Sequence, residues 1–89
     1  MRSMRLAFSS DHATPLSSLA EGEHAVVVGV RGDSAGRVER LLALGVTPHA
    51  RVTMLQRFPG VVFLCDQTEL AVERAVAEGI MVRLEEKRR

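Results

Sequence analysis

The side chains of this 89-residue chain that could bind a metal are few and scattered. Three histidines and one cysteine are the soft or borderline donors: His12, His24, His49 and Cys65. None stands in a Cys-x-x-Cys or His-x-x-x-His arrangement, the spacings that bring two ligands to one metal ion. We therefore expect no resident cofactor. His24, His49 and Cys65 stay as weak candidates for a divalent metal, which includes adventitious zinc or nickel.

The sequence also lacks the common signals of catalysis. Gly29, Gly32 and Gly36 have neither the spacing nor the lysine of a P-loop that cradles phosphate. No candidate nucleophile has a recognisable base beside it, although a base brought close by the fold would leave no such signal. Cys65 is interpreted as a small buried hydrophobe, the commoner role of a free cysteine. We expect a protein that is not an enzyme.

Composition limits the partners and the compartment. Twelve basic and eleven acidic side chains give a net charge of +1, and the chain has three Phe but no Trp or Tyr. Binding of nucleic acid is disfavoured, because it needs a concentrated basic face and usually aromatic rings. A single cysteine excludes an internal disulfide, and no apolar run approaches the ~20 residues of a membrane span. We expect a cytoplasmic protein.

The one strong helical pattern lies in residues 36–48, which read GRVERLLALGVTP. Apolar residues recur there at helical spacing, which predicts a buried stripe made of Val38, Leu41 and Leu42. Gly45 is expected to end the helix in the left-handed conformation, and Pro48 prevents its resumption. Asp33 or Ser34 is the expected cap at its start.

The rest of the chain reads mainly as strands. Alternating or β-rich runs cover residues 24–31, 51–58, 61–65, a short stretch through 70 and 72, and 80–84. Gly29 within the first run permits a bend or a close backbone approach. About five short strands, one inserted helix and a helical turn at 74–78 predict a mainly β, partly open small barrel. It would span residues 15–85, between a flexible leader (1–14) and a charged tail (86–89).

Several short motifs resemble the FeoA family. They are Leu16, Leu19 and Gly22 ahead of the valine strand, Arg40-Leu41 with Leu44-Gly45-Val46 and Pro48, Gly60 in a hairpin, and Ala75, Ile80 and Val82 near the end. The resemblance covers about residues 15–84. It departs from the family at His49, where glycine is usual, and at Asp66-Gln67. Histidine tolerates a positive φ better than a β-branched residue does, so the turn at His49 is expected to persist.

The resemblance implies an SH3-like barrel that accompanies FeoB, a membrane transporter of ferrous iron with a cytosolic GTPase domain. It also implies an alternative role in divalent-metal sensing, because a similar domain ends some metal-dependent repressors. The expected function is a non-enzymatic accessory protein that docks on FeoB and modulates Fe(II) uptake. Contact with the membrane would occur only through that partner, and exposed strand edges would allow a homodimer.

The expected partner-binding residues surround the end of the helix. They form an apolar patch flanked by arginines, made of Arg37, Arg40, Leu44, Val46 and Pro48. The alternative is purely structural: Leu44 would seal the end of the barrel and Arg40 would be solvated.

Overall fold

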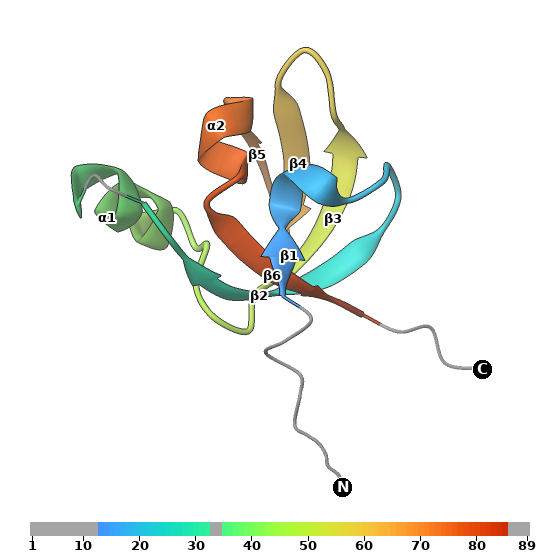
Figure 1. The fold of residues 1–89 in the computed structure, drawn as a ribbon. Coiled ribbons are helices and arrows are strands. Elements are labelled where there is room, and N and C mark those ends of the chain that lie inside the picture. Colours follow the sequence, from blue (N-terminus) through green and yellow to red (C-terminus); the bar gives the residue numbers. More distant parts are fainter. Residues whose placement is uncertain (1–12, 33–34, 86–89) are drawn as a thin grey trace, which may run out of the picture.

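The computed structural model describes residues 13–32 and 35–85, and shows six antiparallel strands with three short helical segments (Figure 1). The elements are β1 (Thr14–Pro15), η2 (Leu16–Ser18), β2 (His24–Val30), α1 (Ala35–Ala43), β3 (Arg51–Gln56), β4 (Val61–Cys65), β5 (Thr68–Val72), α2 (Arg74–Ala77) and β6 (Ile80–Leu84). The predicted mainly β class is confirmed. Residues 1–12, the expected cap at Asp33 or Ser34 and the tail at 86–89 lie outside the described residues. Thr14, assigned above to the leader, already pairs with Val82.

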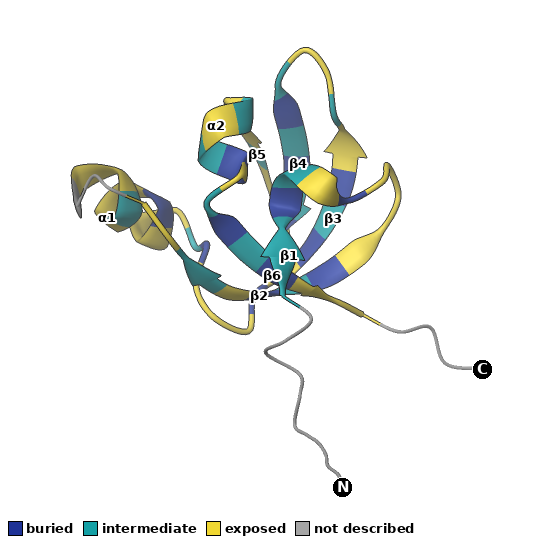
Figure 2. Cartoon of the chain, in the orientation of Figure 1, coloured by how far each residue is buried: buried dark blue, intermediate teal, exposed yellow. Residues whose placement is uncertain are grey.

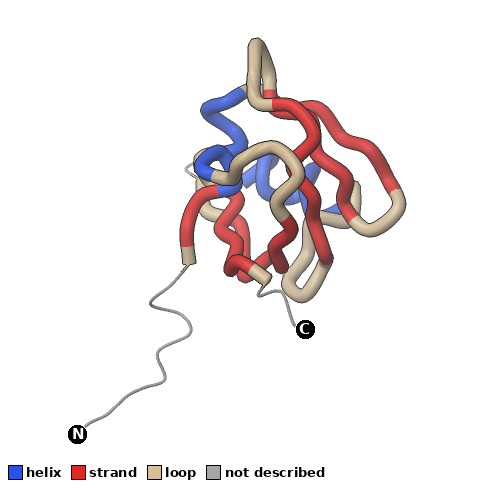
Figure 3. The backbone as a smooth tube through the Cα atoms, turned by 90° about the vertical axis from the view of Figure 1, so that its right-hand side faces the viewer, coloured by secondary structure: helices blue, strands red, loops and turns tan. Residues whose placement is uncertain are grey.

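The strands form one sheet in the order β1-β6-β2-β3-β4-β5. Hairpins join β3 to β4 and β4 to β5, whereas β6, the last strand, pairs with both β1 and β2, the first two. Seen from the side, the strands curl around a common interior (Figure 3). Curling is aided by irregularities in the ladder, between Val27 and Gly29 of β2 and between Met54 and Gln56 of β3.

Two departures from the family pattern are accommodated by positive φ angles. His49 has φ 80° and Asp66 has φ 54°. The backbone N–H of His49 donates to Val27 O, and the N–H of Val27 donates to Ala50 O, both at 2.8 Å. The backbone N–H of Asp66 donates to Arg51 O at 2.7 Å, and the side-chain Oδ1 of Asp66 accepts from the N–H of Arg51 at 3.2 Å. Backbone hydrogen bonds therefore hold both turns, and the expectation for the turn at His49 is confirmed.

The interior is aliphatic apart from one ring. Its largest fully buried side chains are Phe63, Leu16, Leu19, Met54, Ile80, Val27, Val46, Val52, Val61 and Val82. They come from four strands (β2, β3, β4 and β6), η2 and its flank, and the turn after α1, while the strand faces turned outward are more exposed (Figure 2). No described residue with a polar or charged side chain is buried. Burial of apolar surface therefore stabilises the barrel.

The start of β6 approaches the end of β2 very closely. The N–H of Arg31 donates to Gly79 O at 2.6 Å. A Cβ atom on Gly79 would collide with the carbonyl oxygen of Arg31. Glycine is therefore required here by the close approach of two backbones, whereas a Cβ on Gly29 would meet nothing within 4 Å. Gly29 thus serves the bend in β2, the first of the two roles considered above.

Candidate functional site

The end of α1 is a Schellman motif. The N–H of Val46 donates to Leu41 O and the N–H of Gly45 donates to Leu42 O, both at 3.0 Å. Gly45 has φ 102°, the left-handed conformation expected from the sequence. This motif brings the residue after the glycine against the residue five positions earlier. Val46 and Leu41 are accordingly both buried.

The position of Val46 corrects the predicted patch. Val46 is 0% exposed, so it belongs to the core and contributes nothing to a surface for a partner. Its burial follows from the Schellman geometry, which turns its side chain inward, whereas the prediction from the sequence grouped it with Leu44 and Pro48 in an exposed patch. Pro48, in the next turn, is exposed as expected.

The buried stripe of α1 is narrower than its spacing predicts. Leu41 is buried and Val38 is half-buried, but Leu42 is 42% exposed, so its assignment to the core is wrong. Figure 1 shows the reason: α1 stands at one side of the barrel instead of lying flat on it. A helix held along one edge buries a narrow strip and leaves neighbouring apolar side chains in solvent.

The exposed residues of α1 meet α2 across a groove, here called the α1–α2 groove. At one end, which has a volume of about 320 Å³, the lining residues are Arg37, Arg40, Leu41, Leu44, Val72, Glu73 and Val76. Three of the five predicted partner-binding residues therefore line one surface. Leu44 is 51% exposed there, which argues against the structural alternative in which it seals the barrel.

The other end of the groove is wider and opens towards β2 and β6. Its volume is about 820 Å³, and it is lined by Pro15, Val30, Arg31, Gly32, Arg37, Val38, Leu41, Ala75, Val76, Glu78, Gly79 and Met81. Arg37, Leu41 and Val76 line both ends, so the two ends are continuous along α1. Each end is large enough to receive apolar side chains of a partner.

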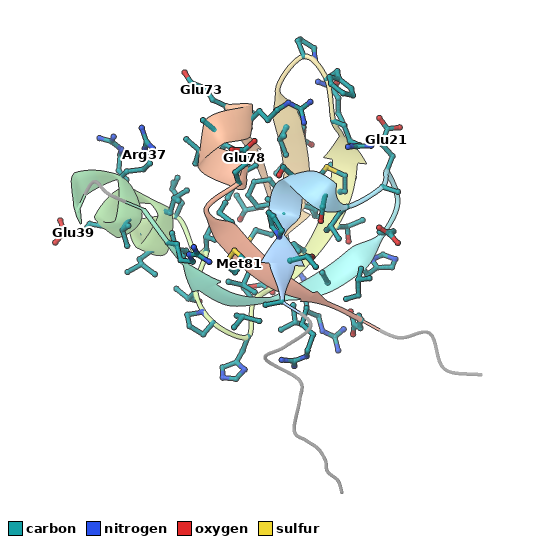
Figure 4. The ribbon with its side chains drawn as sticks, viewed as in Figure 1. Glu21, Arg37, Glu39, Glu73, Glu78 and Met81 are labelled. Atoms are coloured by element: carbon teal, nitrogen blue, oxygen red, sulfur yellow. The ribbon has the colours of Figure 1, made fainter. Side chains whose placement is uncertain are left out.

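Charges of opposite sign stand on the two sides of the groove. Arg37 and Arg40 belong to α1, whereas Glu73 precedes α2 and Glu78 follows it. In Figure 4, Glu39 points away from the barrel and so stays outside the groove. An apolar floor between rims of opposite charge favours an amphipathic segment and fixes its orientation.

Sequence reasoning missed the wall formed by the second half of the chain. Glu73, Val76, Glu78 and Met81 were seen only as a helical turn and the start of a strand. That turn was predicted at 74–78 and is observed as α2 (Arg74–Ala77). The available signal was its mixture of apolar and acidic residues, but no local pattern tells which surface a short helix faces.

The weak metal candidates do not come together as a ligand set. Within residues 13–32 and 35–85, no three or more His, Cys, Asp or Glu side chains lie together so that they could hold a metal ion. His24 Nδ1 lies 2.8 Å from Thr53 Oγ1, and the exposed His49 lies in the turn after α1. His12 is outside the described residues. The absence of a cofactor stays a prediction.

Cys65 is placed as the sequence predicts for a packed residue. It is 3% exposed, and its Sγ donates to Gly45 O at 3.4 Å. Burial, and next the nearby carboxylate of Asp66, raise the pKa of its thiol. A protonated, buried thiol is a poor nucleophile and a poor metal ligand.

None of the helices in the described part of the chain is long and apolar enough to cross a membrane.

Comparison with known proteins relates the whole described domain to one family. The model of the FeoA domain matches residues 14–84. Among curated proteins, none matches the sequence. Among solved structures, FeoA of Chlorobium tepidum is 33% identical, with a TM-score of 0.71, over 79% of this chain and 69% of that one.

Two further structures extend this likeness. An iron uptake regulatory protein (FeoA) is 25% identical, with a TM-score of 0.73, over 82% of this chain and 99% of that one. FeoA of Stenotrophomonas maltophilia, solved with zinc, is 26% identical, with a TM-score of 0.69, over 76% of this chain and 87% of that one. It is described as an SH3 domain protein and suggested to be a ferrous iron transport activating factor.

Proposed function

Because this chain belongs to the FeoA family, as the match over residues 14–84 shows, we propose that it is a non-enzymatic accessory protein of ferrous iron transport. In this proposal it docks on the cytosolic part of a FeoB-type GTPase transporter and modulates Fe(II) uptake. The names of its relatives support the pathway: one is an iron uptake regulatory protein, and another is suggested to activate ferrous iron transport.

The observation that carries the docking proposal is the α1–α2 groove. Leu44 is half exposed on its edge, between arginines of α1 and Glu73. Apolar side chains that stay exposed in a small domain commonly mark a contact surface. The α1 helix and Leu44 directly after it present these side chains at little cost to the barrel, because Leu41 is the one buried side chain among the described residues of α1.

Docking modulates the transporter only by differential affinity. A partner that exchanges between GTP-bound and GDP-bound states shifts its population towards the state that the accessory protein binds more tightly. Equal affinity for both states would leave the equilibrium unchanged. The affinity must therefore be measured in each nucleotide state of the partner.

Two equally exposed leucines give a matched test. Leu44 lines the groove and is 51% exposed, whereas Leu84 is 49% exposed at the end of β6. We expect Leu44→Asp to weaken binding to the purified cytosolic domain of FeoB by at least about tenfold, and Leu84→Asp to leave it unchanged. Isothermal titration calorimetry without nucleotide, with GDP and with a GTP analogue measures this. Circular dichroism of each variant checks the fold.

Two results would contradict this proposal. If the wild-type protein binds the FeoB domain in no nucleotide state, docking on that domain is wrong. If binding occurs but Leu44→Asp and Leu84→Asp bind alike, docking stands and the groove is the wrong surface.

The metal-sensing alternative rests on fold alone. A Thermoplasma acidophilum IdeR structure has a TM-score of 0.76 but only 17% identity. No ligand cluster in the described residues favours this alternative. Anaerobic calorimetry with Fe(II) tests it, because a sensor would show saturable binding that is lost on substitution of a histidine or of Cys65.

A further inference from the structure

The hairpin between β3 and β4 carries the most exposed large apolar side chain of the described residues. Phe58 is 65% exposed, whereas Phe63 on the adjoining strand is fully buried. Phe58 lies in the turn at Arg57–Gly60, which projects beyond the barrel next to α2 (Figure 1). Phe58 lines neither end of the α1–α2 groove.

Two arginines hold this ring in place. The guanidinium carbon of Arg74 lies 4.3 Å from the ring centroid, and that of Arg57 lies 5.7 Å from it. Arg74 Nη2 also donates to Arg57 O at 2.8 Å, which ties α2 to the hairpin turn. A ring fixed in this way loses less conformational entropy when a partner covers it. The contacts are cation–π interactions, which strengthen when water is excluded.

The guanidinium of Arg74 can donate hydrogen bonds to an acceptor on a partner. Arg57 Nε is buried, so a partner's carboxylate cannot reach this nitrogen. Arg74 uses Nη2 for the carbonyl oxygen of Arg57, and the other donors of its guanidinium fork suit a carboxylate. An aromatic ring next to arginines is the combination enriched at the energetic centres of protein interfaces.

We propose that Arg57, Phe58 and Arg74, here called the hairpin-tip cluster, form a second docking surface that binds an acidic segment of a protein partner. The ring would enter an apolar pocket of the partner, and a carboxylate beside that pocket would accept hydrogen bonds from the Arg74 guanidinium, near the positive charge of Arg57. Charge complementarity identifies the chemistry of the segment. This surface is separate from the α1–α2 groove and does not depend on the function proposed for that groove.

A protein segment suits this cluster better than an anionic membrane does. Recognition of anionic lipids by charge usually needs clusters of about four to eight basic residues. Here there are two arginines, and Glu73 directly precedes Arg74. Two cations beside one ring suit a single carboxylate at a defined position. They would attract the spread-out negative charge of a membrane only weakly.

Nuclear magnetic resonance titration of the full chain tests this inference. The probes are a short capped peptide that carries glutamate next to leucine, the same peptide with lysine in place of glutamate, and vesicles of phosphatidylserine and phosphatidylcholine. We expect the acidic peptide to shift the Phe58 ring and Arg74 side-chain resonances. The lysine peptide and the vesicles should leave them unchanged.

Substitutions separate this surface from its neighbours. Phe58→Ala and Arg74→Gln should each weaken binding of the acidic peptide by about threefold or more. Leu55→Ala is the matched control, because Leu55 is 41% exposed on β3 of the same hairpin. Leu44→Asp should also leave peptide binding unchanged, so this inference and the proposed function fail separately. The inference is overturned if the acidic peptide causes no shift at the cluster, if both peptides act alike, or if only the vesicles bind.

Discussion

The barrel and α1 are stabilised in different ways. The barrel buries a continuous set of side chains from its strands and η2, and its ladders pair every strand with at least one neighbour. In α1, by contrast, one side chain, Leu41, is buried among the described residues of the helix. The Schellman motif and the hydrogen bonds between the following turn and Val27 hold its exit instead.

The residues that stabilise the protein therefore differ from those that could contact a partner. Apolar burial accounts for most of the stability of a small domain, so the free energy of unfolding should depend on the barrel. The exposed side chains Leu42 and Leu44, on α1 and directly after it, bury little apolar surface and so should contribute little to that energy. Residues of a docking surface on such a helix can be substituted without unfolding the protein.

The largest effect is expected from the one aromatic ring in the core. Phe63 is fully buried on β4, and Phe63→Ala should lower the free energy of unfolding by about 3–5 kcal/mol. Phe58→Ala, which removes the exposed ring, should cost less than about 1 kcal/mol, the value of its cation–π contacts. Urea denaturation followed by circular dichroism measures both. Similar losses for the two variants would contradict the view that stability lies in the core.

The next effect tests how α1 is attached. Leu41 and Leu42 are neighbours of the same size, but Leu41 is 5% exposed and Leu42 is 42% exposed. Leu41→Ala should lower the free energy of unfolding by about 2 kcal/mol, and Leu42→Ala by less than about 0.5 kcal/mol. The same urea titration compares them. Equal losses of unfolding free energy would mean that Leu42 is buried as well, as helical spacing predicts.

The elements of the barrel follow from the sequence because their signals are local. Alternation and turn residues place β2, β4 and β6 within a residue or two of the observed bounds, and Gly45 marks the end of α1. Each depends on the conformations that neighbouring residues allow. The family resemblance added the SH3-like arrangement, which local pattern alone left at a small barrel.

The groove depends on contacts that local pattern does not contain. Helical spacing treats Leu41 and Leu42 as equivalent, and only the tilt of α1 against the barrel distinguishes them. Val46 is buried because a Schellman motif brings it back onto Leu41, a tertiary consequence of a left-handed glycine. Glu73 and Val76 line the groove together with Arg40 and Leu44, although these two pairs lie far apart in the sequence.

The smallest effect is expected where the two regions join. Cys65 Sγ donates to the carbonyl oxygen of Gly45, so the thiol reports whether the exit of α1 opens. Its raised pKa means that the thiolate forms at higher pH in the native protein than in the denatured chain. Alkylation by iodoacetamide, followed by mass spectrometry, should therefore be slow at pH 8 in the native protein. Its rate should keep rising at pH values where the denatured chain has reached its plateau.

Two glycine substitutions make this a test of the junction. Gly45 has φ 102°, so Gly45→Ala is strained and should loosen the exit turn by about 1 kcal/mol, which speeds alkylation about fivefold. Gly36→Ala is the control, because a Cβ on Gly36 meets nothing within 4 Å and its φ is not positive. If Gly45→Ala and Phe63→Ala instead speed alkylation in proportion to their losses of unfolding free energy, Cys65 opens only with the whole barrel. The exit turn would then belong to the barrel, and the boundary between the two regions would lie at Leu41 instead.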